Sequence, residues 1–592
     1  MPEQHRTALA ALAPSTTTFA SAIRRTFRVG YSLRDLRGDV LAGIVVAVVA
    51  LPLSMALAIA SGVPPQHGIY TAIVAGALTA LLGGSSVQVT GPTAAFVVVL
   101  APISAKFGLG GLLLATIMAG GLLVAAGLAK FGRLIEFIPY PVTTGFTSGI
   151  AVVIATLQIK DFFGLNIAEM PESYIGKVQA IVAAAPTFHI PDVAIGLGSL
   201  GVLFLLPKFT KVIPSPLIAL PAAGIIAYLM GLDVATINSR FTITLGGVTH
   251  HGIPQLPPMP MLPWAVPGPD GQQLVLSVDL IRSLIGSAFA IAMLGAIESL
   301  LSAVVSDGMT GLRHDPDAEL IGQGVGNIVA PFFGGFAATG AIARTAMNIR
   351  CGARSPFAAV SHALFILAAV LLVAPLLGYL PMASMAALLL MVAWNMSELK
   401  HFFYVLRTGP RGDVFVLLVC FLLTVIFDMV VSVSVGVVLA AILFMRRMAD
   451  VSSVNLVAAS SEQAEIHLPP SAIVYQIGGP LFFGAAQKAM SALRTVQRGI
   501  GTVILDLTAV PIIDATGLVN LESSIERLRK SEIYVIIAGV QPEPLRAIAR
   551  AGWEKQHRAW LTVRRSLSDA TALAWARHSE FQPSPADKPD GQ

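Results

Sequence analysis

Long apolar segments alternate with short polar connections over the first 450 residues, and this pattern then stops. Apolar segments that suit helices crossing a bilayer occur in two sets of seven, separated by a wetter, proline-rich segment at 232–279. The predicted spans are 40–60, 68–82, 92–104, 110–129, 142–160, 192–207 and 215–231, then 280–302, 321–335, 341–350, 357–375, 380–395, 413–428 and 430–447. Because seven is odd, the second set runs through the membrane in the opposite direction. The pattern predicts an all-α membrane fold of fourteen spans in two inverted repeats.

The third member of each set is short and interrupted. Gly83–Phe96 and Gly334–Ala346 each contain a glycine pair, an extended stretch, a Thr-Gly pair and then the start of a helix. We expect the helices to begin near Pro92, placed at the first helical position, and near Ala341. Non-helical backbone at membrane depth is tolerated only where it is buried in protein or lines a cavity. Paired interruptions in two repeats point to a transporter site between two half-helices, although simple kinks in two buried helices are the alternative.

An anion suits this place, because helix N-termini present free N–H groups and a positive dipole end. Arg344 adds a permanent charge that can bind a carboxylate through two nitrogens. Packing, without binding, is the alternative for the alanines and for Arg344, and a plain kink is the alternative for Pro52 next to Leu53. The predicted substrate-binding residues are Leu53, Ser54, Thr90, Thr93, Ala94, Ala95, Ala343, Arg344 and Thr345.

Glu298 is the only charged residue in the segment 288–301. An ionisable side chain inside a span is a functional candidate by default, and we predict that Glu298 carries a co-transported proton. A structural ion pair with Arg344 is the alternative. His362 can relay protons, but a lone histidine there is more often hydrogen-bonded to backbone, and Asp428 near a span end is expected to be solvated or to cap a helix.

Composition agrees with a membrane transporter. Of 592 residues, 55% are hydrophobic and only 12% are charged, against about 25% charged in soluble proteins. The net charge of +5 follows from bases at the ends predicted to be cytoplasmic, so we expect both termini inside and no nucleic-acid partner. The two cysteines form no metal-binding spacing, and no phosphate-binding loop of the Walker type occurs. We therefore expect no metal, no cofactor and no enzymatic activity, and we find no cleavable signal peptide.

Beyond the spans the chain has the pattern of a soluble α/β domain. Strands are predicted at 473–477, 502–506 and 533–537, and helices at 484–497 and 515–530. The predicted division is a cytoplasmic segment at 1–38, a transporter domain at 39–449 with repeats at 39–231 and 280–447, a soluble domain at 450–578 and a disordered tail at 579–592.

Several stretches resemble the SulP family of anion transporters, whose members end in a STAS domain. These are Val63–Tyr70, the half-helix at Gly91–Thr93, the Arg344 half-helix and the soluble domain. Further stretches are similar to DauA-type C4-dicarboxylate transporters of that family: Phe131–Glu136, Ala292–Leu301 and Ala387–Met396. The resemblance implies a 7+7 inverted-repeat fold, elevator-like movement of a core domain past a gate domain, and homodimers.

The resemblance also bears on coupling and regulation. Sodium-coupled bicarbonate members carry Asp, Thr and Thr where this sequence has Glu298, Ser302 and Arg344. Since an arginine beside a cation site repels sodium, we expect proton coupling. In the soluble domain, Ile513–Gly517 resembles the Asp-Ser-Ser-Gly phospho-acceptor loop of anti-sigma-factor antagonists, with Thr516 at the acceptor position and Ala515 in place of the first serine. Helix capping by Asp514 and Thr516 is the alternative, and docking of a cytoplasmic protein partner is a further expected role of this domain.

Together these features predict a secondary transporter in the bacterial inner membrane that takes up C4-dicarboxylates such as succinate, fumarate or aspartate with protons. Sulfate or bicarbonate transport, or chloride-type exchange, are the alternatives within the family. A nucleobase symporter shares the inverted repeats, but there the acidic residues that read the base are not expected beside an arginine. A membrane-tethered signalling protein does not need fourteen spans and a paired half-helix site.

Overall fold

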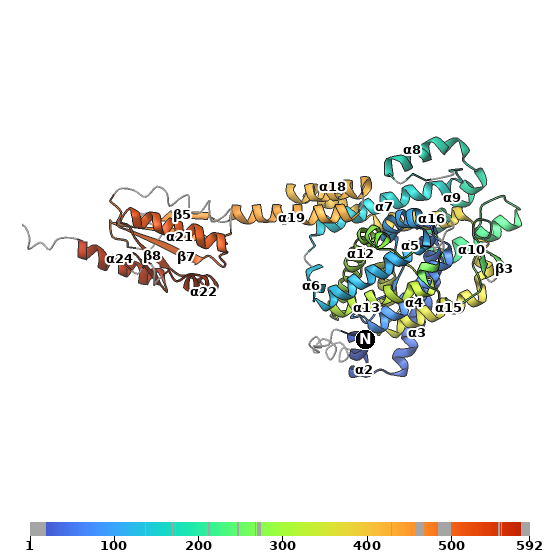
Figure 1. Cartoon of the computed structure of the whole chain (residues 1–592), viewed down its shortest axis with the longest axis horizontal. Helices are drawn as coiled ribbons and strands as arrows, with labels where there is room; N and C mark the ends of the chain where they lie inside the picture. The colour runs from blue at the N-terminus through green and yellow to red at the C-terminus, as the bar shows by residue number, and fades with distance from the viewer. Residues whose placement is uncertain are drawn as a thin grey trace, which may run out of the picture. The chain divides into compact units, whose positions relative to one another are not determined.

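The computed structural model describes residues 19–581 except 136–137, 168–169, 172, 211–213, 246–247, 267, 269–273, 428, 452, 458–466, 483–498, 554–556 and 558. The chain divides into two compact units, Met1–Val438 and Leu439–Gln592. The first is helical and contains the broken segments, and the second contains a five-stranded sheet (Figure 1).

The helical unit has the fold of two seven-span repeats, and every predicted span corresponds to a helix or to part of one. The first repeat consists of α3 (Leu33–Ala60), α4 (Pro65–Leu82), β1 (Thr90–Gly91), α5 (Ala94–Leu128), α7 (Tyr140–Phe162), α9 (Ile190–Phe209) and α10 (Ser215–Leu229). The second consists of α12 (Val278–Thr310), α13 (Pro316–Val329), β4 (Thr339–Gly340), α14 (Ile342–Arg350), α15 (Phe357–Leu377), α16 (Met382–Met396), α18 (Arg411–Ile426) and α19 (Met429–Val451). The part of α19 from Leu439 onward belongs to the second unit.

Shorter elements connect the spans. They are α2 (Ser21–Val29), α6 (Gly132–Ile135), α8 (Tyr174–Ala184), η1 (Ala185–Thr187), α11 (Ile237–Arg240), β2 (Thr242–Leu245), β3 (Val248–His251), η2 (Pro263–Ala265), η3 (Ala330–Phe333) and α17 (Leu399–Thr408). The segment 232–279 is therefore not a plain loop, because it contains the β2–β3 hairpin. Likewise, α2 gives the N-terminal segment a helix that its polar composition did not predict.

Eight described helices are long and apolar enough to cross a membrane on length and composition alone. One of them, α5, contains both the predicted half-span 92–104 and the predicted span 110–129. The chain kinks between them at Gly108, where φ is 68°. A residue with a side chain is disfavoured in that conformation, so the glycine allows two spans to continue as one bent helix.

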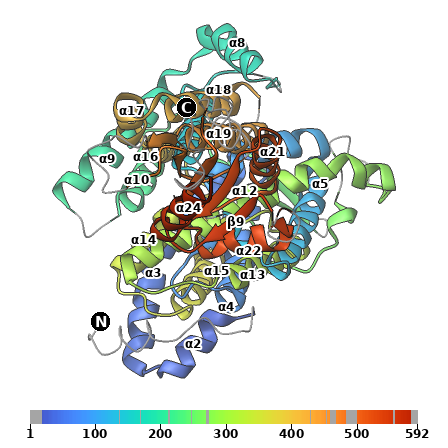
Figure 2. The same ribbon diagram turned by 90° about the vertical axis from the view of Figure 1, so that its left-hand side faces the viewer.

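The spans pack as two groups. In the core group, α3 packs against α15, and α5 packs against α12 and α13. In the gate group, α7 packs against α16 and α18, and α9 packs against α10 and α16. Figure 2 shows α3, α4, α13 and α15 on one side and α8, α9 and α10 on the other. The groups meet where α16 contacts α3 and where α7 contacts α5.

The two broken segments meet in the core group. β1 pairs antiparallel with β4, with Thr90 opposite Gly340 and Gly91 opposite Thr339. The N–H of Ala341 extends this pairing by donating to the carbonyl of Val89 at 2.9 Å. α5 and α14 begin directly after the two strands, so their N-termini lie close together, as the sequence predicts.

Buried side chains satisfy the backbone groups of the first broken segment. One carboxylate oxygen of Glu319, on α13, accepts the N–H groups of Gly84 at 2.9 Å and Ser85 at 3.0 Å. Its other oxygen accepts from the Gln88 amide at 2.7 Å and from the Ser299 hydroxyl at 3.1 Å. Unpaired backbone groups inside a membrane cost several kcal/mol each, so this carboxylate holds the non-helical chain in place.

Side chains of α13 also satisfy backbone groups of the second broken segment. The amides of Gln323 and Asn327 donate to the carbonyl of Ala338 at 2.5 Å and 3.1 Å, and the N–H of Ala338 donates to Asn327 Oδ1 at 2.8 Å. The N–H of Phe336 donates to the Thr71 hydroxyl at 2.8 Å. The polar residues of α13 therefore serve the broken backbone of both repeats.

Thr93, extended at φ −122° and ψ 159°, is the N-cap of α5, whose first helical residue is Ala94. Pro92 thus precedes the cap and does not occupy the first helical position, contrary to our expectation. The carbonyl of Pro92 faces Arg344. At the first helical position this carbonyl would instead point along the helix and accept from the backbone.

The second unit is an α/β domain built on one sheet. The strands are β5 (Ser453–Val457), β6 (Ala472–Gly478), β7 (Thr502–Ala509), β8 (Tyr534–Ala538) and β9 (Leu561–Arg564), ordered β5-β6-β7-β8-β9. β6 to β9 run parallel. The described helices are α21 (Ala515–Lys530), α22 (Pro542–Ala551) and α24 (Leu567–Phe581). The predicted strands and the helix 515–530 are confirmed, whereas the helix 484–497 and nearly all of the tail lie outside the described residues.

Replacing Glu319 with alanine tests the role of the carboxylate. Because the N–H groups of Gly84 and Ser85 lose their acceptor, Glu319→Ala should lower the free energy of unfolding of the helical unit by about 3 kcal/mol. The chain has two cysteines, Cys351 and Cys420, both in this unit, and Cys420 is buried. Thermal unfolding followed with a thiol-reactive dye therefore reports on the helical unit alone.

Asp279→Ala is the matched control, since it removes an exposed carboxylate from the first turn of α12 and should leave the melting temperature within a degree or two of wild type. Equal melting curves for the two variants would show that Glu319 is not needed to hold the broken segment.

Candidate anion site

Arg344 lies in the first turn of α14 and is almost completely buried, with 4% of its surface exposed. Its Nη2 donates to the carbonyl of Pro92 at 3.1 Å and lies 3.5 Å from the Ser54 hydroxyl. Among the described residues, Nε and Nη1 find no hydrogen-bond partner. A buried guanidinium with free N–H groups is costly unless something binds it.

The position of the guanidinium depends on Gly91. A Cβ atom at residue 91 would lie 2.6 Å from Arg344 Nη1, well inside van der Waals contact. The pairing of β1 with β4 therefore brings a residue without a side chain to the place where Arg344 needs room. This contact could not be predicted from the sequence, because Gly91 and Arg344 lie far apart along the chain.

Glu298, on α12, lies beside the other half-helix. Its carboxylate accepts the Thr93 hydroxyl at 2.7 Å. Among the described residues no ion pair joins it to Arg344, since none within 4.0 Å is found. The alternative of a closed Glu298–Arg344 pair is therefore not seen, and the acidic and the basic group each remain open to a ligand.

A cavity of about 300 Å³ lies between the core and gate groups, and both Arg344 and Glu298 line it. Its lining is mostly apolar, and its polar members are few. The predicted residues that line it are Leu53, Thr93, Ala94, Ala95, Glu298, Ala343 and Arg344. The half-helices α5 and α14 both begin at its wall, and no side chain in the described part of the chain caps either N-terminus. Their first N–H groups therefore add hydrogen-bond donors at the cavity wall.

Three predicted residues lie behind this wall. Ser54 is buried next to Arg344. Thr90 lies in β1. The Thr345 hydroxyl accepts the N–H of Val89 at 3.1 Å and the Ser302 hydroxyl at 3.2 Å. Thr345 thus joins the two broken segments and supports the geometry of the site.

The cavity also has lining residues that our sequence reasoning missed. They are Leu57, Pro92, Phe146, Thr147, Leu294, Leu301, Ala341, Ile342, Val392, Asn395, Met396 and Glu398. Most belong to apolar faces with no distinguishing pattern. Asn395 could have been found, because it is a polar residue within the last turn of an otherwise apolar span.

Other candidates lie elsewhere. His362 is completely buried in α15, and neither ring nitrogen has a hydrogen-bond partner in the described part of the chain, so the backbone contact expected of it is not found there. In the second unit, Thr516 is exposed in the first turn of α21, while the Asp514 side chain accepts the N–H of Gly517 at 2.6 Å. Asp514 is therefore the helix cap, and Thr516 is not. Asp428 lies outside the described residues.

A model of the sulfate permease family matches residues 36–420, and a STAS domain model matches residues 463–570. The chain belongs to the sulfate permease family. It is an anion transporter of that family, which confirms the expected class, and the relatives named below are transporters. The broken half-helices and Arg344 thus lie in a transport protein.

Two curated members give the scale of similarity. "Putative sulfate transporter YvdB" of Bacillus subtilis is 40% identical over 88% of this chain and 95% of its own length. "Bicarbonate transporter BicA" of Picosynechococcus is 29% identical over 87% and 91%. The solved murine Slc26a9 anion transporter, in the inward-facing state, matches 94% of each chain with a TM-score of 0.79 at 19% identity, which shows a shared fold. The similarity to DauA-type dicarboxylate transporters has no counterpart among these relatives.

Gly91→Ala tests the placement of the guanidinium. The added methyl group should displace Arg344 Nη1. An anion that protects the wild-type protein from thermal unfolding should therefore bind the variant about tenfold more weakly, or weaker still. Gly286→Ala is the matched control, because open space surrounds that glycine on α12. The anion concentration for half-maximal protection is the measurement, and an unchanged value in Gly91→Ala would mean that the anion does not contact Arg344.

Proposed function

We propose that this sulfate permease family member takes up C4-dicarboxylates together with protons across the bacterial inner membrane, by an elevator-like movement of the core group past the gate group. The observation that carries the proposal is the buried Arg344 guanidinium at the wall of a mostly apolar cavity, whose Nε and Nη1 have no hydrogen-bond partner among the residues that the structure describes. A carboxylate would accept from this guanidinium and from the free N–H groups at the starts of α5 and α14.

The lining of the cavity supports a four-carbon dianion. Leu53, Leu57 and Leu294 offer apolar contact to a short carbon chain, which sulfate lacks. On the gate side, the Asn395 amide would donate to the second carboxylate.

Glu298 is the proposed proton carrier. It lines the cavity, is hydrogen-bonded to Thr93 and has no ion-pair partner among the described residues. Proton binding at Glu298 would remove a negative charge from the path of an anion. Substrate and proton would then enter together, because the ionised carboxylate repels a dianion at close range.

Sulfate or bicarbonate is the second candidate substrate, favoured by the names of the two relatives. A tetrahedral or planar anion would also accept from Arg344 and from the helix N-termini. The candidates differ in what the apolar lining contributes. Affinity should rise with the length of the carbon chain only if the substrate is a dicarboxylate.

The accessory expectations remain proposals as well. They comprise a homodimer, cytoplasmic termini, a cytoplasmic protein partner for the STAS domain, and phosphorylation of Thr516. The exposed position of Thr516 supports access by a kinase. Asp514 already caps α21, so a phosphate on Thr516 would add negative charge close to an existing carboxylate.

A substrate panel with Arg344→Ala tests the proposed substrate. Succinate and fumarate should protect the wild-type protein against unfolding at lower concentrations than sulfate or bicarbonate, and Arg344→Ala should abolish both protection and uptake into proteoliposomes. Arg350→Ala, which removes an exposed arginine at the other end of α14, should retain both. Protection by sulfate alone would assign the second candidate, and normal uptake by Arg344→Ala would make Arg344 structural.

Glu298→Gln tests the coupling. Because glutamine cannot exchange a proton, an inward proton gradient should no longer drive accumulation, while exchange of substrate between the two sides continues. The measurement is substrate uptake into proteoliposomes with and without a pH gradient, at fixed sodium. Uptake that follows sodium and ignores the pH gradient in the wild-type protein would contradict the proposal.

A further inference from the structure

We propose that α2 and the first turns of α3 form a binding surface for anionic phospholipid headgroups, here called the basic face. It consists of exposed basic and apolar side chains next to the start of the first span. Its members are Arg24, Phe27, Arg28, Leu33, Arg34, Leu36 and Arg37.

The opposite side of α2 is docked on the core group. Ser21 and Ala22 are buried. The N–H of Ala20 donates to the carbonyl of Leu82 at 2.8 Å, at the end of α4. Arg25 donates to the carbonyl of Arg313 at 2.5 Å. α2 is thus held at a defined place by contacts that leave Arg24 and Arg28 exposed. Phe27 packs edge-to-face on Phe357 of α15, with the ring centroids 5.9 Å apart.

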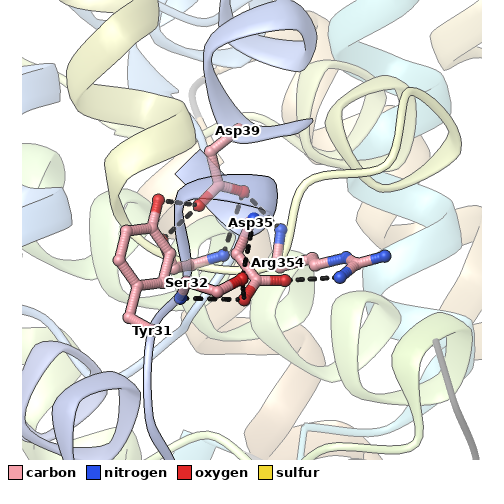
Figure 3. A network of polar contacts seen from close by, with 6 residues as sticks. Tyr31, Ser32, Asp35, Asp39 and Arg354 are labelled. Atoms are coloured by element: carbon pink, nitrogen blue, oxygen red, sulfur yellow. Dashed lines mark hydrogen bonds and ion pairs between the residues drawn. The ribbon is translucent and has the colours of Figure 1, made fainter. Parts of the chain in front are cut away.

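A polar network fixes the turn between α2 and α3 (Figure 3). The Tyr31 hydroxyl donates to Asp39 at 2.8 Å. Burial raises the pKa of the Tyr31 phenol, which therefore keeps its proton and remains a donor. Asp35 accepts from Ser32 in a capping box and forms an ion pair with Arg354. These hydrogen bonds tie the turn residues Tyr31 and Ser32, which follow α2, to the first turns of α3.

The exposed side of α2 combines charge with an aromatic ring. Arg24, Phe27 and Arg28 follow the i, i+3, i+4 spacing that brings side chains to one side of a helix. All three are exposed, and Phe27 exposes 63% of its surface. An amphipathic helix with arginines beside a large apolar group is typical of helices that lie in the lipid interface.

The exposed stripe of α3 places this surface at headgroup depth. Leu33, Leu36, Val40 and Leu41 are exposed along it, as expected for a span that faces acyl chains. Arg37 is exposed on the same stripe, one turn before Val40 and Leu41. The change from basic to purely apolar residues therefore marks the boundary between headgroups and hydrocarbon, and α2 lies beyond that boundary.

No exposed acid balances these arginines in the described residues 19–41. The two acids there, Asp35 and Asp39, are both buried and hydrogen-bonded. Arginine binds phosphate oxygens in a planar, often bidentate geometry. An anionic lipid such as phosphatidylglycerol fits both the charge of the basic face and its continuity with the membrane-facing stripe.

Titration of the full-length protein, in a neutral detergent, with short-chain phosphatidylglycerol tests the proposal. Each arginine near a membrane surface contributes a factor of about five in affinity, so Arg24→Gln with Arg28→Gln should weaken binding about 25-fold. Added salt should weaken binding to the wild-type protein. Short-chain phosphatidylcholine lacks the negative net charge, and glycerol phosphate lacks the acyl chains. Both should bind weakly to the wild-type protein and to the variant.

Arg546→Gln with Arg550→Gln is the matched control, since it removes an exposed pair at the same spacing on α22 of the second unit. This variant should bind phosphatidylglycerol as the wild type does. Equal weakening of phosphatidylglycerol binding by the two double variants would show that binding depends only on the net charge of the protein. Unchanged binding in the α2 variant, or binding of glycerol phosphate as tight as that of the lipid, would overturn the proposal.

Discussion

The hydrogen-bonding demand of non-helical backbone inside a membrane is the constraint on which this structure depends. Two segments leave the helical conformation near the middle of the core group, and every peptide group they expose needs a partner where no lipid can provide one. They partly satisfy each other through the β1–β4 pairing. Polar residues of α13, chiefly Glu319 and Asn327, supply much of the remainder. A helix that contributes nothing to the cavity lining thereby maintains the site.

The chemistry of the site follows from the same break in the helices. Ending the helical hydrogen-bond pattern at Pro92 leaves a carbonyl that accepts from Arg344. Starting α5 and α14 there leaves N–H groups that no side chain caps. The interruption therefore creates both the groups that hold the arginine and the groups that can bind an anion beside it. Glu298 and Thr93, joined by one hydrogen bond, add an acidic group close to these donors.

Hydrophobic patterning was enough to predict the spans, the two interruptions and the meeting of the half-helices. It also pointed to Arg344 and Glu298, because a charge in an apolar span is conspicuous. It could not reveal that Glu319 serves the first broken segment, since that contact joins residues more than two hundred positions apart. The helical position of Pro92 was misjudged because a proline suits both the first turn and the residue before a cap. The apolar cavity residues were missed because a leucine facing a cavity looks the same in sequence as one facing lipid.

The tight meeting of the two repeats has an evolutionary consequence. A Cβ at Gly91 would overlap Arg344, and a Cβ at Gly340 would lie 2.2 Å from the Gln88 amide. Each half of the protein therefore limits which residues the other half can accept at these points. Although the repeats lie some 250 residues apart, neither can drift alone here, so substitutions at Gly91 and Gly340 should arise in homologues only with compensating changes at residues 344 and 88.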